Sequence, residues 1–105
     1  PLWLAPVQAR LLPVGEAQLD FAKEVAAKMV SEGIRAEVDT SGDRLGKIIR
    51  NAEKQKIPVM AVIGAKEVES NSLSIRTRAS GELGAIPVGE VVDKMKNAIA
   101  NFENF

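Results

Sequence analysis

The sequence contains no cysteine, no histidine and no tyrosine, and its only tryptophan is Trp3. Without cysteine and histidine, the chain lacks disulfides, thiolate nucleophiles, imidazole bases and the usual ligand sets of transition metals. The shortage of aromatic residues also leaves little surface for the base stacking that typical single-strand binders use. An independent small enzyme is therefore an unfavoured hypothesis, because the commonest catalytic side chains are missing.

An excess of charge of one sign is also lacking. Fourteen basic and fourteen acidic residues cancel, so any binding to nucleic acid has to come from a local arrangement of charge. No apolar run approaches the roughly 20 residues that span a bilayer, and residues 1–6 do not have the features of a cleavable signal. The 105 residues fit one domain, and without an initiator methionine we expect a fragment of a longer protein.

The chain does contain short apolar segments separated by Gly and Pro. Apolar residues recur at every third or fourth position in three segments, which predicts helices over 16–31, 45–54 and 88–102. Strands are expected at 7–12, 34–39, 59–63, 73–78 and 83–86. Segment 59–63 is apolar on both faces, as in a central strand covered on both sides. The sequence therefore predicts an α/β domain with three helices and a mixed five-stranded sheet, parallel at its centre.

Residues 41–47, Ser-Gly-Asp-Arg-Leu-Gly-Lys, superficially resemble a phosphate-binding loop. The two glycines are one residue too close for that motif, however, and Ile48 stands where a serine or threonine binds magnesium. A tight turn explains the same residues, with Gly42 giving backbone freedom and Ser41 or Asp43 near the start of a helix. The tight turn is the favoured interpretation.

One acidic and one basic residue follow the predicted central strand. Glu67 comes directly after that strand and should lie at the carboxyl edge of the sheet, where such sheets bind ligands, while Arg76 comes from the next strand. A carboxylate suits the two donors on the Watson–Crick edge of guanine, and a guanidinium suits the two acceptors on its Hoogsteen edge. The pair therefore fits an unstacked guanine in an RNA loop, although a surface ion pair worth at most about 1 kcal/mol explains the same residues.

Five segments carry a resemblance to a known family. They are residues 1–8 (PLWLAPVQ), 33–39 (GIRAEVD), 66–69 (KEVE), 75–78 (IRTR) and 81–84 (GELG). In this order they resemble the carboxyl-terminal anticodon-binding domain of threonyl-tRNA synthetases, which are class II aminoacyl-tRNA synthetases, and the resemblance covers nearly the whole chain. Prolyl, histidyl and glycyl synthetases share the architecture, but the Lys-Glu-Val-Glu segment at 66–69 and the Arg-Thr-Arg segment at 76–78 look like the threonyl branch.

This resemblance implies that residues 1–105 form an anticodon-binding domain without catalytic residues. It implies that Glu67 and Arg76 contact the anticodon bases, which agrees with the guanine in the middle of threonine anticodons. Many family members have Arg-Asn-Glu-Lys where this chain has Ser-Gly-Asp-Arg at 41–44, so the amide of the family's asparagine is missing at Gly42. Four basic residues would contact phosphates or position the loop, namely Lys66, Arg78, Arg44 and Lys47.

The resemblance also implies a parent enzyme, a threonine–tRNA ligase, that attaches threonine to its tRNA. ATP, magnesium and a catalytic zinc would belong to its catalytic core and not to this domain, and the parent would be a homodimer. The implied partner is threonine tRNA, with no DNA and no membrane involved. Segment 41–47 resembles cyanobacterial and plant organellar enzymes, so a chloroplast, a mitochondrion or a bacterial cytoplasm is the expected location. Two alternatives stay open: an accessory or dimerisation module, and the corresponding domain of a prolyl, glycyl or histidyl synthetase.

Overall fold

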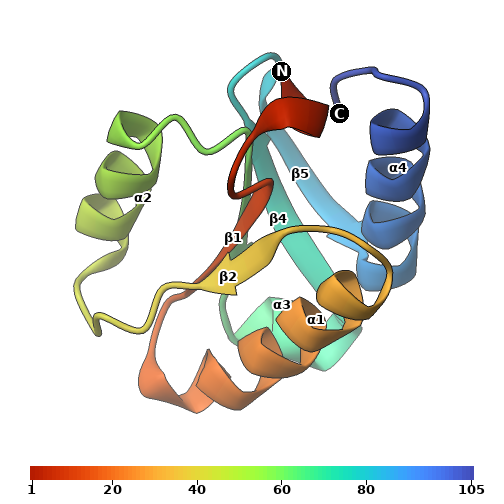
Figure 1. Cartoon of the computed structure of the whole chain (residues 1–105). Helices are drawn as coiled ribbons and strands as arrows, with labels where there is room; N and C mark the ends of the chain where they lie inside the picture. Colours follow the sequence, from red (N-terminus) through yellow and green to blue (C-terminus); the bar gives the residue numbers. More distant parts are fainter.

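A computed structural model, which describes residues 1–105, shows a five-stranded sheet in the order β2–β1–β3–β4–β5 (Figure 1). The strands are β1 (Ala9–Pro13), β2 (Ala36–Val38), β3 (Val59–Ile63), β4 (Ser72–Thr77) and β5 (Gly81–Pro87). β1 is parallel to both of its neighbours, whereas β4 is antiparallel to β3 and to β5. The prediction of an α/β domain with a mixed five-stranded sheet is confirmed.

Three long helices are present where the apolar spacing predicts them. They are α1 (Leu19–Ser31), α2 (Leu45–Lys54) and α4 (Val88–Ala100). α4 ends two residues before Phe102, which has a positive φ of 56° and lies outside the helix that the sequence pattern predicted. A fourth helix, α3 (Ala65–Ser70), was not predicted, because a helix of six residues is too short to show an apolar period.

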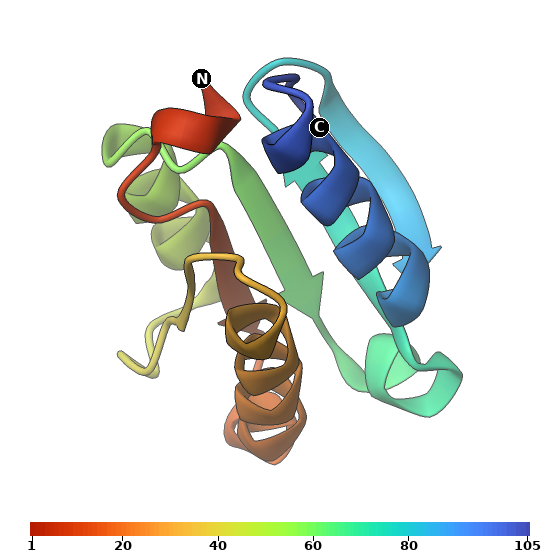
Figure 2. The same ribbon diagram turned by 45° about the vertical axis from the view of Figure 1, so that its right-hand side comes forward.

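The two faces of the sheet are covered unequally. α1 and α4 cover one face, where they form an apolar cluster of 18 residues with side chains from strands that include β4, such as Leu73 and Ile75. α2 lies on the other face and contributes to a cluster of five residues: Leu12, Ile48, Ala52, Ile57 and Met60. Figure 2 shows α1 and α4 on the near side of the sheet and α2 on the far side. No residue of β4 or β5 belongs to the smaller cluster, so we call this side of β4 and β5 the open face.

β1 carries a buried arginine that joins three parts of the chain. Arg10 is 8% exposed, and its Nε donates a hydrogen bond of 2.7 Å to Oε1 of Glu37 on β2. Its Nη2 donates to the same carboxylate and to Oε1 of Gln55, which follows α2. Because buried charges need partners, this arrangement fixes the end of α2 against the sheet.

The two ends of the sheet carry different elements. The carboxyl ends of β1, β2 and β3 lead into the loop at 14–15, the loop at 39–44 and helix α3. At the other end lie the two termini, which Figure 1 shows close together. The Leu2 N–H donates a hydrogen bond of 3.3 Å to Oδ1 of Asn104, and the Trp3 ring packs edge-on against Phe102 with 5.9 Å between centroids. The termini therefore lie away from the edge where the parallel strands end.

Candidate nucleic-acid interface

Glu67 lies in the first turn of α3, immediately beyond the carboxyl end of β3, where the sequence places it. Its Oε1 accepts a hydrogen bond of 2.7 Å from the N–H of Gly64, and the carbonyl of Gly64 accepts one of 3.2 Å from Val68. The carboxylate thus caps the start of the helix. It is half-buried, and one cap hydrogen bond leaves most of its acceptor capacity for a ligand.

Arg76 lies on the open face of β4, in register with Met60 of β3 and Glu82 of β5. Its side chain is 39% exposed, and its Nη2 lies 3.6 Å from Oε2 of Glu82. It alternates along β4 with the buried Leu73 and Ile75, which face α1 and α4. The guanidinium is therefore presented to solvent by a strand whose other side is fixed in the core.

Glu67 and Arg76 lie toward opposite ends of β3. Arg76 is level with Met60, the second residue of the strand, whereas Glu67 comes after the last residue, Ile63. The rise from Met60 to Gly64 alone is about 13 Å. The backbone of Arg76 lies back from the carboxyl edge, because the antiparallel β4 carries the chain away from that edge before Arg76 is reached.

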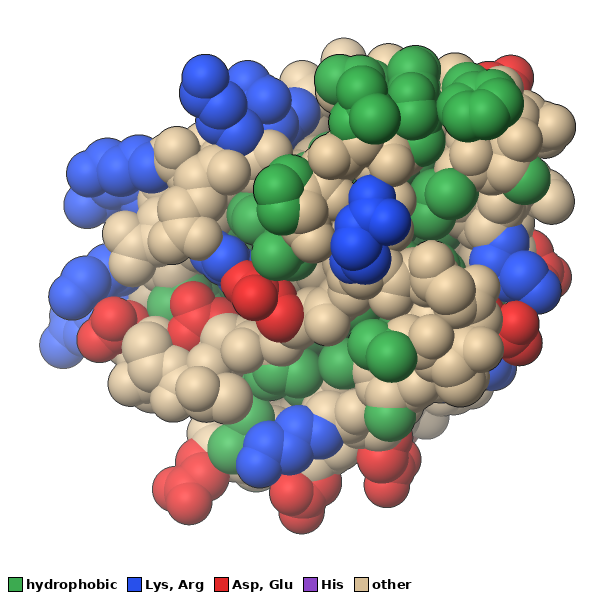
Figure 3. All heavy atoms as spheres, viewed as in Figure 1, with side chains coloured by type: hydrophobic (Ala, Val, Ile, Leu, Met, Phe, Trp, Pro, Cys, Tyr) green, Lys and Arg blue, Asp and Glu red, His purple; other side chains and the backbone are tan.

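The four supporting basic residues are all exposed but occupy different places. Lys66 precedes Glu67 on α3. Arg44 is the N-cap residue of α2, and Lys47, in its first turn, lies 3.5 Å from the Asp43 carboxylate. Figure 3 shows basic side chains gathered over α2. These basic side chains therefore lie on the same side of the sheet as the open face.

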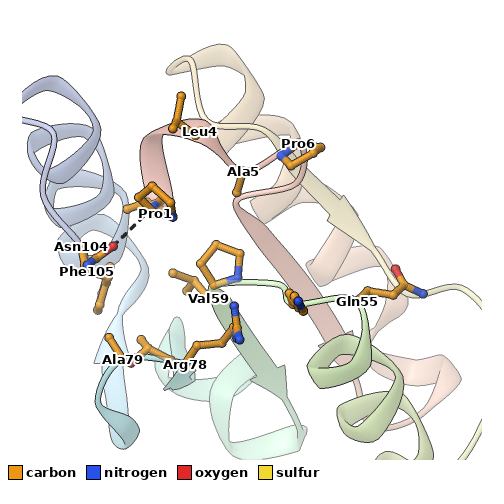
Figure 4. Close-up of a pocket in the computed structure, with 14 residues that line it drawn as sticks. Pro1, Leu4, Ala5, Pro6, Gln55, Val59, Arg78, Ala79, Asn104 and Phe105 are labelled. Carbon is orange, nitrogen blue, oxygen red and sulfur yellow. Dashed lines mark hydrogen bonds between the residues drawn. The ribbon is translucent and has the colours of Figure 1, made fainter.

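Arg78 lies at the end of the sheet where the termini are. Its N–H donates a hydrogen bond of 3.1 Å to the carbonyl of Pro58, just before β3. Together with Arg76 it lines a hollow of about 330 Å³ on the open face, whose other lining residues are Glu53, Met60, Thr77 and Gly81. It also borders a second hollow, of about 760 Å³, between the termini and the start of β3; Figure 4 shows Arg78 reaching toward Val59 there. The structure therefore brings Arg76 and Arg78 together.

Two carboxylates near Arg76, Glu53 and Glu82, were not predicted from the sequence. Glu53 is near the end of α2 and lines the hollow with Arg76. Glu82 belongs to β5, which bulges relative to β4 beside Arg76. A possible signal is the pair Gly81 and Gly84, both with positive φ, since glycines flanking a strand residue often mark a bulge. The helix and strand periods alone do not reveal either neighbour.

Segment 39–44 is a tight bend before α2, as the favoured interpretation of its sequence has it. Oδ1 of Asp39 accepts hydrogen bonds from the Ser41 N–H at 2.9 Å and from the Ser41 hydroxyl at 2.6 Å. The Ser41 hydroxyl oxygen in turn accepts one of 3.2 Å from the Asp43 N–H. Gly42 has φ of 75°, a conformation that glycine adopts without strain. This bend is stabilised by hydrogen bonds to its own side chains.

No group of three or more acidic side chains is arranged to hold a metal ion. None of the helices combines the length and the apolar character that crossing a membrane requires.

Known proteins resemble this chain in sequence and in structure. Residues 8–98 match the model of a family described as "Anticodon binding domain". Over 105 residues the chain is 67% identical to the threonine–tRNA ligase of Synechocystis sp., of which it covers 17%. It is 54% identical over 99 residues to the chloroplastic/mitochondrial threonine–tRNA ligase 2 of Arabidopsis thaliana, covering 94% of this chain and 15% of that protein.

A solved structure agrees with these sequence matches. The RNA binding domain of threonyl-tRNA synthetase from Cryptosporidium parvum Iowa II superposes with a TM-score of 0.86 and 25% identity. The superposition covers 92% of this chain and 24% of that one. This chain thus spans less than a fifth of the two ligases and about a quarter of the structure.

Proposed function

The chain belongs to the anticodon binding domain family, and from that premise we propose that it binds the anticodon loop of threonine tRNA. The observation that carries the proposal is the 67% identity, over the full chain, to a protein named threonine–tRNA ligase. The family supports tRNA as the partner, and the names of the relatives support the threonine branch. The open face beside a basic α2 surface gives such a loop a place to lie.

In this proposal the loop crosses the open face from the start of α3 toward the far end of β4. Arg76 binds the Hoogsteen edge of a guanine with two N–H donors, and Glu67 accepts from base donors near the carboxyl edge. Their separation along β3, about 13 Å between the levels of Met60 and Gly64, is longer than one nucleotide step of about 3.4 Å in a stacked strand. A base that both side chains contact therefore has to be splayed out of the stack, as in an unstacked loop.

The exposed basic residues have a different part in this proposal. Lys66, Arg78, Arg44 and Lys47 contact phosphates and thereby set the position of the loop, because contacts to the backbone orient a nucleic acid without reading its sequence. Gly42 gives no side chain to a base, so contacts from this bend come from backbone groups or from Ser41.

We propose further that residues 1–105 serve as the anticodon-binding domain of a longer threonine–tRNA ligase, which attaches threonine to its tRNA with ATP. The chain's match to 17% of the Synechocystis ligase supports this. ATP, magnesium and a catalytic zinc are then assigned to other parts of that protein, which we expect to be a homodimer. The cyanobacterial and plant organellar relatives favour a bacterial cytoplasm, a chloroplast or a mitochondrion as its location.

An accessory or dimerisation module is the contrasting hypothesis. It predicts that Glu67 and Arg76 can be replaced without effect on tRNA binding, and that changes at the edge of the sheet disrupt an oligomer. A domain from a prolyl, glycyl or histidyl synthetase is the second alternative. The high identity to threonine–tRNA ligases favours our proposal over both.

A titration tests base reading directly. The chain is titrated with a labelled anticodon stem-loop of threonine tRNA and with the same stem-loop carrying adenine in place of the middle guanine. Both Kd values are measured at one stated salt concentration, because phosphate contacts make affinity salt-dependent. We expect tighter binding to the guanine loop. Equal affinity for the two loops would contradict base reading by this chain.

A further inference from the structure

Arg76 is the middle residue of a row of three that crosses the open face. Its Cα is in register with Met60 on β3 and with Glu82 on β5. Exposure rises along this row, from 2% for Met60 to 39% for the Arg76 side chain and 66% for that of Glu82. Arg76 therefore has a buried apolar neighbour on one side and an exposed carboxylate on the other.

A bulge in β5 places the carboxylate there. The ladder pairs Ile75 with Gly84 and then Arg76 with Glu82, so Leu83 has no partner on β4. In a regular ladder Arg76 would be level with Leu83 instead. Gly84 follows the extra residue with φ of 82°, a backbone conformation that side chains other than glycine seldom adopt and that is common at bulges. The bulge thus gives Arg76 a charged neighbour in place of an apolar one.

The distance between the Arg76 guanidinium and the Glu82 carboxylate allows Glu82 to orient the arginine while leaving its other N–H donors available for a ligand. Nη2 of Arg76 and Oε2 of Glu82 are 3.6 Å apart, which is an ion pair but longer than a normal hydrogen bond. A guanidinium has five N–H donors, so donors remain for the O6 and N7 acceptors of guanine. A long side chain that is oriented before binding loses less rotamer entropy when it binds.

We propose that Glu82 is a positioning residue for Arg76, holding its guanidinium over the open face so that its remaining donors meet a base. This inference rests on base reading by Arg76, as proposed above. The negative charge of Glu82 also repels RNA phosphates, so its two effects have opposite signs. Removing the charge strengthens binding to any RNA, whereas losing the orientation weakens only the preference for guanine.

The decisive quantity is the Kd for the adenine loop divided by the Kd for the guanine loop, which measures the preference for guanine. Glu82→Gln keeps the size of the side chain and removes its charge, and we expect it to lower this ratio by about 1.5- to 5-fold, the range of exposed ion pairs. Glu82→Asp keeps the charge and should retain most of the ratio. The matched control is Glu24→Gln, which removes the same charge from an exposed site on α1, on the other side of the sheet; its ratio should stay that of the wild type.

The same measurements are repeated in an Arg76→Ala background, where Glu82→Gln should no longer change the ratio. Thermal unfolding of each variant checks that it folds, which we expect because Glu82 is exposed. A Glu82→Gln ratio equal to that of Glu24→Gln would overturn the proposal. An equal decrease in the Kd values of Glu82→Gln for both loops would also overturn the proposal, because it would show that Glu82 acts only as a charge that repels RNA.

The Arg76→Ala variant separates failure of this inference from failure of the proposed function. If Arg76→Ala lowers the ratio and Glu82→Gln does not, Arg76 reads the base without help from Glu82. If the wild type and Arg76→Ala bind both loops with the same affinity, base reading itself is wrong, and the positioning role is wrong with it.

Discussion

The two faces of β4 differ in what covers them. On one face, Leu73 and Ile75 are buried in the larger apolar cluster beneath α1 and α4. On the other, Ser74 and Arg76 lie outside the smaller apolar cluster to which α2 contributes, and they stay partly exposed. Because side chains alternate along a strand, the same six residues contribute to the core on one side and, in the proposed function, to recognition on the other. A rigid strand fixed from behind holds a binding side chain more accurately than a loop does.

Substitution in the covered face should have the largest effect on stability. Ile75→Ala removes buried methyl groups and leaves a cavity, so we expect the free energy of unfolding to fall by about 2–5 kcal/mol. Urea unfolding followed by circular dichroism measures it. The matched control is Ser74→Ala on the open face, which should stay within about 0.5 kcal/mol of the wild type. Equal losses at the two positions would contradict the division between the faces.

The buried arginine tests whether α2 depends on the sheet for its placement. Arg10→Ala removes the partner of Glu37 and Gln55, and because Glu37 is 43% exposed solvent compensates part of the loss. We expect a decrease of about 1–3 kcal/mol in the free energy of unfolding. Hydrogen exchange of the α2 amides should increase more than that of the α4 amides. Unchanged protection of α2 would show that the smaller apolar cluster alone fixes this helix.

Substitution in the open face should change binding and not folding. Arg76→Ala is expected to cost about 1–3 kcal/mol in affinity for the guanine loop and to relax discrimination against the adenine loop. Its unfolding midpoint in urea should match that of the wild type. A loss of stability comparable to that of Ile75→Ala would instead mean that Arg76 belongs to the core.

The basic surface of α2 should give the smallest change. Lys47→Ala is expected to weaken binding to both loops to the same extent and to reduce the slope of log Kd against log salt by about 1. Fluorescence anisotropy at four or five salt concentrations gives this slope. A change in base preference would show that Lys47 contacts a base and not a phosphate.

Local patterns predicted most of the elements. β3 has the predicted limits, 59–63, because a run that is apolar on both faces bounded by Pro58 and Gly64 has few other arrangements. α3 has only six residues, fewer than two turns, and its sequence is mostly polar. It is capped by the Glu67 carboxylate at the Gly64 N–H, a local hydrogen bond that apolar spacing does not encode.

The candidate site was predictable in part. The position of Glu67 followed from the end of a recognisable strand, whereas that of Arg76 depended on the direction and register of β4. Period-two spacing gives the face of a strand but not the strand beside it or the direction in which it runs. Glu82 depended in addition on a bulge, which shifts every pairing beyond it by one residue. Only the structure therefore shows which side chains the strand register brings together.

The closeness of the termini also has a practical consequence. Because the Leu2 N–H is hydrogen bonded to Asn104, a linker of a few residues should be able to close the chain into a ring. New ends could then be opened in another exposed loop, a kind of site where circular permutation usually succeeds. The domain could likewise be inserted as a cassette into a surface loop of a host protein, with the carboxyl edge of its sheet directed outward and free to meet RNA.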